Sequence, residues 1–319
     1  MDTGSRRIPV EVVFTLGMVA ALLVLALIFR LPIMVPTSGA AMFMEMHYLL
    51  PLVGVAAWAL CAVVGQREQL MRTFLIGLPC YAVVLVVHFN IKLMVPHVNP
   101  TTWDPLFWSI DQAARPLVDF CIAARKWLRP VLPYEGQAYM ISFIALFYIS
   151  FCYHAVRTPL VFRKLFLAAL FLQGLGALAY LPFPALGPFI YENGANPSVT
   201  EAQHFMLHVN QLSVAGGPAW LSQNGDSVLL AGLGAMPSLH AGGSFLFLWF
   251  AVRHARVLLP TYVPIFAFIL MAAIGNRWHY LIDLPVGIAL AWLSIHLAYR
   301  LDREPAQAAA PAGLQPAAA

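Results

Sequence analysis

Long apolar runs recur along this chain, and they constrain its fold more than any other feature. A helix needs about 20 apolar residues to cross the hydrocarbon core of a bilayer. Eight runs near this length are bounded by charged residues, prolines or polar clusters: 9–29, 47–65, 73–95, 137–156, 164–182, 238–252, 258–275 and 284–299. Only 10% of the residues are charged, against roughly 25% in soluble domains. The pattern predicts an all-α polytopic membrane helix bundle with about eight transmembrane helices.

The basic residues between these runs predict its orientation. Short cytoplasmic loops of membrane proteins carry an excess of Lys and Arg. With the N-terminus inside, eight crossings place eleven of the 18 basic residues on the cytoplasmic side and leave seven outside or near the outer surface. We therefore expect both termini on the cytoplasmic side of a bacterial-type inner membrane. The net charge of +4 is interpreted as this orientation signal, and no nucleic-acid partner is expected.

The runs divide the chain into three predicted regions. Residues 1–134 hold N-terminal spans and an interfacial segment, 135–303 a transmembrane core, and 304–319 a tail of Ala, Pro and Gln that is typical of a disordered end. The first run has the positive flank of a secretory signal. Its apolar stretch exceeds the roughly 7–15 residues of a signal peptide, which favours a retained span over a cleaved signal.

Two outer segments are too long to be simple turns. The pattern from Trp103 to Arg129 predicts an amphipathic helix in the outer interface, kinked at Pro116, and we interpret it as a structural belt without chemistry. The 186–236 loop carries His204 and His208, whose spacing would suit a metal on one helical face. Without a third ligand in the sequence around them, neither a metal nor another cofactor is expected, and the role of this loop stays open.

Two polar clusters stand at the ends of apolar runs, where an ionisable group is a first candidate for function. The first is Gly234–Gly242, which contains Pro237, Ser238 and His240, and the second is Arg277–Asp283, which contains His279. Between the two histidines the chain crosses the membrane once in each direction. Both histidines are therefore expected at the same outer surface.

The types of residue in these clusters predict phosphoryl transfer. His279 and Asp283 are four residues apart, so on one helical turn the carboxylate would accept the imidazole N–H, although Pro285 allows Asp283 to be a helix N-cap instead. A histidine supported in this way suits a nucleophile or a base, and His240 can protonate a leaving group. The helix start at Pro237-Ser238 offers a seat for an anion. Together they indicate a phosphohistidine mechanism.

At these residues the sequence resembles the type 2 phosphatidic acid phosphatase superfamily. Pro237-Ser-Leu-His240 is similar to its second motif, Pro-Ser-x-His, and His279-x-x-x-Asp283 is similar to part of its third. The same clusters look most like the branch that holds the inositol phosphorylceramide synthases, and Tyr180–Pro188 is similar to that branch's first segment. The resemblance covers roughly residues 180–287. It implies a six-helix-type, phosphatase-like catalytic core within 135–303.

The resemblance also implies roles for individual residues. His279 would be the nucleophile, Asp283 its partner and His240 the acid that protonates the leaving alkoxide. The substrate-binding residues would be Pro237, Ser238, Tyr180 and Arg277.

The sequence departs from the family pattern in its phosphate-binding cations. The Lys and Arg-Pro that begin the phosphatase branch are not found before Tyr180 with the family's spacing, and Ala272-Ala273 replaces the Ser-Arg that precedes the third motif. Arg277 is the candidate to substitute for the missing arginine. With fewer cations, a phosphodiester lipid is favoured over a dianionic phosphomonoester.

The expected function is a membrane lipid phosphotransferase, with its active site on the extracytoplasmic side and no metal. It would move a phosphoryl-linked head group from a phospholipid to a hydroxyl acceptor. The alternative enzyme is a lipid phosphatase that uses water as the acceptor. A membrane transporter is the alternative of another class, but it would need polar residues deep in several spans, and apart from His88 and Lys92 the runs are nearly free of them.

Overall fold

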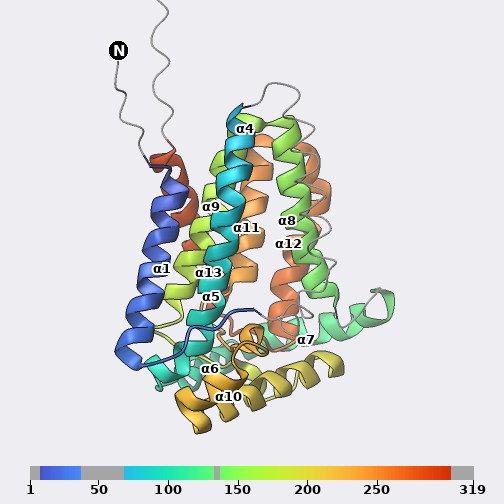
Figure 1. Cartoon of the computed structure of the whole chain (residues 1–319). Helices are drawn as coiled ribbons and strands as arrows, with labels where there is room; N and C mark the ends of the chain where they lie inside the picture. Colours follow the sequence, from blue (N-terminus) through green and yellow to red (C-terminus); the bar gives the residue numbers. More distant parts are fainter. Residues whose placement is uncertain (1–7, 37–67, 133–136, 303–319) are drawn as a thin grey trace, which may run out of the picture.

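The computed structural model describes residues 8–36, 68–132 and 137–302, and these contain helices and no strand. Figure 1 shows long helices side by side in one bundle, with three further helices lying across one end. The long helices are α1 (Val10–Phe29), α5 (Leu78–Val98), α8 (Ala138–Arg157), α9 (Pro159–Ala179), α11 (Leu239–His254), α12 (Leu259–Gly275) and α13 (Asp283–Leu301). The helices across the end are α6 (Asp104–Ala113), α7 (Arg115–Leu128) and α10 (Pro197–Asn224).

Short helical segments join these elements. They are α4 (Glu68–Arg72), the π-helical η1 (Thr73–Gly77), and the 3₁₀ turns η2 (Arg129–Val131), η3 (Pro188–Ile190), η4 (Leu229–Ala231) and η5 (Arg256–Leu258). The long helices pack mainly around α9 and α11: α9 contacts α5, α8, α11 and α13, while α11 contacts α8, α9, α12 and α13. The last helices of the chain therefore surround the α11 segment that carries the first polar cluster.

Six helices of the described residues are long and apolar enough to cross a membrane. They are α1, α8, α9 and α13, with Leu70–Val98 around α5 and Arg256–Gly275 around α12. This confirms a polytopic helical membrane protein. The predicted crossing at 238–252 corresponds to α11, whose 16 residues rise only about 24 Å, although it packs at the centre of the bundle. The predicted crossing at 47–65 lies outside the described residues.

The fifth predicted span begins earlier than the sequence indicated. We expected charge to bound it at Lys164, but α9 begins at Pro159 and includes both Arg163 and Lys164. Proline is well tolerated in the first turn of a helix because its missing N–H would have no intrahelical partner there. Asp302 neutralises both cations, with nitrogen–oxygen distances of 3.0 Å to Arg163 and 3.8 Å to Lys164.

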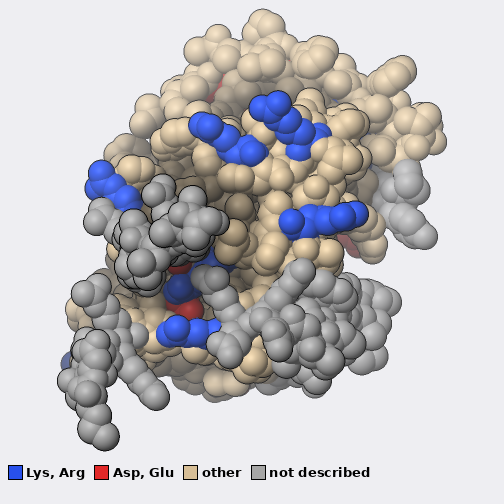
Figure 2. Space-filling view, turned by 90° about the horizontal axis from the view of Figure 1, so that it is seen from above, with Lys and Arg blue, Asp and Glu red and all other residues tan. Residues whose placement is uncertain are grey.

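The two ends of the bundle differ in charge. Figure 2 looks onto the end opposite α6 and α10, and Lys and Arg side chains are spread over it. The basic residues in the helix ends and turns on this side are Arg72, Arg157, Arg163, Lys164, Arg253, Arg256 and Arg300. The positive-inside rule predicts a cytoplasmic position for this end.

At the other end, α11 and α13 approach each other backbone to backbone. A Cβ atom added to Gly242 would lie 2.5 Å from the carbonyl oxygen of Gly287, and one added to Gly287 would overlap the carbonyl oxygen of Ser238. Only glycine allows this approach, so the two helices that carry the two clusters begin in direct contact.

Candidate active site

The start of α11 brings the first cluster onto the second. Ser238 is the N-cap of α11, and its Oγ accepts a hydrogen bond from the N–H of Ala241 at 3.3 Å. The Ser238 N–H donates to the backbone oxygen of Asp283, the first residue of α13, at 3.1 Å. Pro237 and Ser238 are both buried. The helix start that was expected to bind an anion thus also connects α11 to α13.

His279 is held in one orientation by the turn before α11. Its Nδ1 lies 2.7 Å from the carbonyl oxygen of Ala235 and 3.4 Å from Oδ2 of Asp283. A carbonyl oxygen can only accept, so Nδ1 carries the proton and Nε2 carries the free lone pair. The residue is buried, at 7% exposure. The residue expected as the nucleophile therefore has its tautomer fixed by the fold.

The reason for the proximity of His279 and Asp283 differs from the one expected. They do not share a helical turn, because α13 begins at Asp283 and His279 lies in the turn before it. Asp283 is not the N-cap either, since Ile282 holds that position. Its Oδ2 accepts the N–H of Tyr280 at 2.8 Å, which folds the turn back onto the helix start. Pro285, in the first turn of α13, is compatible with this arrangement.

His240, the second residue of α11, lies in an aromatic wall. Its ring centroid is 4.9 Å from that of Tyr139 and 4.8 Å from that of Phe143, both on α8. His279 and Lys92 are both close enough to act on it electrostatically. The Tyr139 hydroxyl is buried and has no hydrogen-bond partner among the described residues. The structure thus brings the two histidines together and adds a phenol that the sequence did not point to.

Lys92, on α5, is a second residue near the two histidines that neither motif contains. Its Nζ lies 5.4 Å from the ring centroid of Tyr180, the buried residue that ends α9. A Cβ atom at Gly234 would come within 3.1 Å of Lys92 Cε and 3.0 Å of the Tyr180 ring, so the glycine leaves room for both side chains. A lysine inside an apolar span is rare unless it has a function, and this was the available sequence signal.

Arg277, the arginine expected at the substrate, lies between two carboxylates. It is fully buried, with Nη2 2.9 Å from Asp111 Oδ2 and Nε 2.9 Å from Glu192 Oε1. Its guanidinium also lies over the Trp108 ring, 5.5 Å from the centroid. Asp111 Oδ1 accepts the N–H of Leu281 at 2.9 Å. These contacts tie the turn that holds His279 to α6.

Asp104, at the start of α6, makes a second set of contacts. Its carboxylate accepts the N–H groups of Leu186 and Gly187 at 2.9–3.0 Å and the Tyr280 hydroxyl at 2.7 Å. Burial and the Asp104 charge raise the pKa of Tyr280 far above its ordinary value, so this hydroxyl stays protonated and donates. The predicted helix from Trp103 to Arg129 is interrupted near Pro116, as expected. Its interpretation as a purely structural element was incomplete, because α6 holds the turns of the candidate site in place.

The two histidines considered as metal ligands lie elsewhere. His204 and His208 are exposed on α10, and the described residues contain no group of three His, Cys, Asp or Glu side chains able to hold a metal ion. His240, His279 and Asp283 are among the described residues and do not form such a group.

We expect activity to survive chelation. Incubation with EDTA followed by desalting should change the initial rate by less than about twofold, because the site itself supplies a nucleophile, an acid and a cation. Loss of activity that is restored by zinc or magnesium would instead require metal ligands, and alanine variants of His204 and His208 would then test these two residues.

The geometry defines a helical membrane protein with a paired-histidine site formed where two helices start. The model of the PAP2 superfamily matches residues 112–297, more than half of the chain, and the chain therefore belongs to the PAP2 superfamily. This confirms the resemblance at the level of the superfamily, and the match begins at the end of α6, well before residue 180. No curated protein and no solved structure matches the chain.

Proposed function

We propose that this PAP2 protein is a lipid phosphotransferase of the inositol phosphorylceramide synthase type. It would move a phosphoryl-linked head group from a phospholipid to a hydroxyl acceptor at the outer face of the membrane. Family membership supports chemistry on lipid phosphates. The observation that carries the proposal is the hydrogen bond between His279 Nδ1 and the Ala235 carbonyl, because it leaves the Nε2 lone pair for attack.

In the first step, Nε2 of His279 attacks the phosphorus of the donor phosphodiester. The bond between phosphorus and the diacylglycerol oxygen breaks, and the imidazolium form of His240 gives its proton to that oxygen. The head group stays on phosphorus, which is now bonded to His279. Asp283, 3.4 Å from Nδ1, stabilises the positive charge that the ring acquires.

In the second step, the hydroxyl of the acceptor attacks the same phosphorus. Neutral His240 takes the hydroxyl proton, the bond between phosphorus and His279 breaks, and the enzyme returns to its starting protonation state. Lys92 lies where it can offset the negative charge of the phosphoryl oxygens in both steps, and the Tyr139 hydroxyl is a donor beside His240.

Two observations favour transfer from a phosphodiester over hydrolysis of a phosphomonoester. Lys92 lies on the Tyr180 ring and acts electrostatically on His240, while Arg277 is engaged by Asp111 and Glu192, and a single cation suits the single charge of a diester. His279 and Tyr180 are only 7% and 4% exposed, which restricts the entry of water. The lipid phosphatase remains the second candidate, with water in place of the acceptor.

The experiment is an assay of purified protein with phosphatidylinositol labelled in the inositol ring, with and without ceramide. Transfer predicts labelled lipid product that depends on ceramide, together with diacylglycerol in equal amount. Release of water-soluble inositol phosphate at the same rate without ceramide would support hydrolysis instead. Release of free phosphate from phosphatidic acid, faster than either reaction, would favour the monoester phosphatase.

Replacing Lys92 by methionine should lower kcat/KM by about 10- to 100-fold, since a hydrogen bond to a charged group contributes about 1.5–3 kcal/mol. The apolar side chain keeps the packing against Gly234 and the Tyr180 ring. Lys126→Met is the matched control, because Lys126 is exposed on α7. Equal rates for the two variants would remove Lys92 from the phosphate site.

A further inference from the structure

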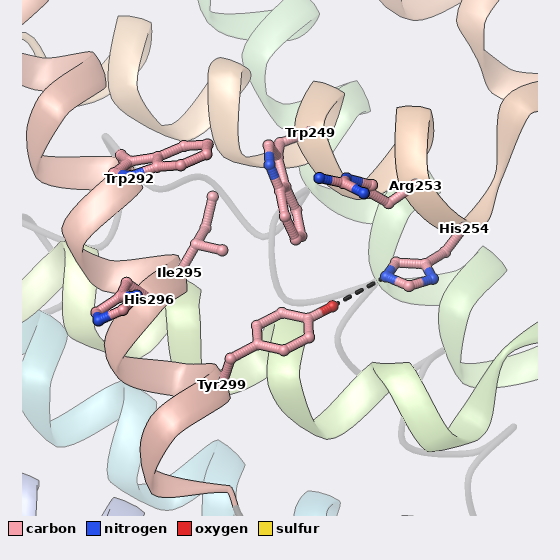
Figure 3. A pocket seen from close by; sticks show the side chains of 7 residues that line it. All are labelled: Trp249, Arg253, His254, Trp292, Ile295, His296 and Tyr299. Atoms are coloured by element: carbon pink, nitrogen blue, oxygen red, sulfur yellow. Dashed lines mark hydrogen bonds between the residues drawn. The ribbon is translucent and has the colours of Figure 1, made fainter.

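A cavity of about 340 Å³ opens between α11 and α13 at the basic end of the bundle, opposite the two histidines. Seven side chains line it, and Figure 3 shows them on two helix faces that meet. Trp249 and Arg253 come from α11, one helical turn apart, while Trp292 and Tyr299 come from α13. Its volume lies within the roughly 300–1,000 Å³ of small-molecule sites.

The packing of the two helices explains why the cavity is at this end. They start in backbone contact at Gly242 and Gly287, where no side chain fits between them. At the other end large aromatic residues of the two helices contact each other, with ring centroids 5.6 Å apart for Trp249 and Tyr299 and 6.4 Å for Trp249 and Trp292. The helices are thus in backbone contact near the two histidines, and the cavity between them at the basic end is called the wedge below.

The polar groups of the wedge favour an anion. Arg253 lies over the Trp249 ring, 5.6 Å from its centroid, and no carboxylate of the described residues forms an ion pair with it. His254 Nε2 is 2.9 Å from the Tyr299 hydroxyl, a contact drawn in Figure 3. Lys164 lies 5.7 Å from the centroid of the Tyr299 ring, but Asp302 pairs with it, so Arg253 is the cation that the cavity offers. The cavity lining contains no Asp or Glu.

The apolar groups favour an amphiphile over a free anion. Trp292 is 55% exposed and the adjacent Leu293 is 45% exposed on the outer surface of α13, whereas Ile295 closes the floor of the cavity at 4%. Tryptophan and tyrosine are typical of the level of lipid head groups, and basic pockets between spanning helices suit anionic head groups. The wedge thus combines a cation, Arg253, with an exposed apolar surface at Trp292 and Leu293.

We propose that this wedge binds an anionic phospholipid, with its phosphate at Arg253 and an acyl chain along Trp292. This site goes beyond the proposed function, because it lies at the end of the bundle away from His240 and His279 and needs no reaction there.

The test is native mass spectrometry of the full chain in a nonionic detergent, after addition of phosphatidylglycerol or phosphatidylcholine with the same acyl chains. A His279→Ala background prevents turnover of added lipid. We expect at least about fivefold more phosphatidylglycerol than phosphatidylcholine adducts. Arg253→Gln should remove most of this preference, whereas Arg256→Gln, an exposed arginine outside the lining, should keep it.

Two further arms complete the test. Trp292→Ala should weaken phosphatidylglycerol retention about threefold or more, and since this side chain is more than half exposed the variant should fold. Excess glycerophosphoglycerol, the soluble head group, should not displace the lipid. The proposal is overturned if the two arginine variants lose phosphatidylglycerol equally, if Trp292→Ala has no effect, or if the soluble head group competes as well as the lipid.

Discussion

His279→Ala is expected to lower kcat/KM by at least about three orders of magnitude, because removing the nucleophile of a catalytic unit eliminates its covalent route. The protein should remain inserted and monodisperse, since the side chain contacts the Ala235 carbonyl and Asp283 through Nδ1 alone. The measurement is initial-rate kinetics on the labelled lipid, with the thermal midpoint recorded for each variant. His204→Ala is the matched control, because that histidine is exposed on α10.

A substrate with an acidic leaving group separates the roles of the two histidines. His240→Ala should be almost inactive on the lipid but recover much of its rate on a p-nitrophenyl phosphodiester, whose leaving group needs no proton. His279→Ala should stay inactive on both substrates. Recovery by the His279 variant in place of the His240 variant would reverse the assigned roles, and normal turnover of the lipid by His279→Ala would contradict the mechanism.

Asp111→Ala is expected to lower the free energy of unfolding by about 3 kcal/mol and the activity by at least about tenfold. Removing one member of a buried ion pair typically costs about 3–5 kcal/mol, and we expect the lower end of this range because Glu192 still pairs with Arg277. Asp111 and Arg277 are both fully buried and 2.9 Å apart, and Asp111 also binds the backbone before α13. The measurement is reversible unfolding in mixed micelles of increasing SDS content.

The matched control for this change is Asp119→Ala on α7. Asp119 also pairs with an arginine, Arg115, but its side chain is 57% exposed, so the loss should stay below about 0.5 kcal/mol. Equal effects of the two substitutions would mean that the contacts of Asp111 with Arg277 and Leu281 do not position the turn that holds His279. An Asp111 variant with full stability and reduced activity would point to a more direct role for Arg277.

The spans were predictable because spacing and apolarity decide them, while their exact ends were not. Charge was taken as the limit of a span at Lys164, but Asp302, from the far end of the chain, neutralises that charge inside α9. Such a partner cannot be recognised from local sequence. The spacing of His279 and Asp283 indicated the right pair, but on the assumption that they share a helical turn. In the structure the turn before α13, and not a helix, brings them together.

The residues around the two histidines were harder to predict. An amphipathic pattern shows which face of a helix is polar, but it does not show whether that face meets water or protein. Asp104 and Asp111, two turns apart on α6, belong to the polar residues of that pattern, yet they are 1% and 0% exposed. Lys92 and Tyr139 reach the site from α5 and α8, far from both motifs in the sequence.

The measurement that tests the mechanism most directly is a rapid-quench trap of the covalent intermediate. The protein is mixed with phosphatidylinositol carrying ³²P in its phosphodiester, without acceptor, and stopped in alkali, where phosphohistidine survives. We predict label on the peptide that contains His279, formed within the first turnover and discharged by ceramide. Product formed in the first turnover without labelled protein, or label on any residue other than His279, would contradict the account.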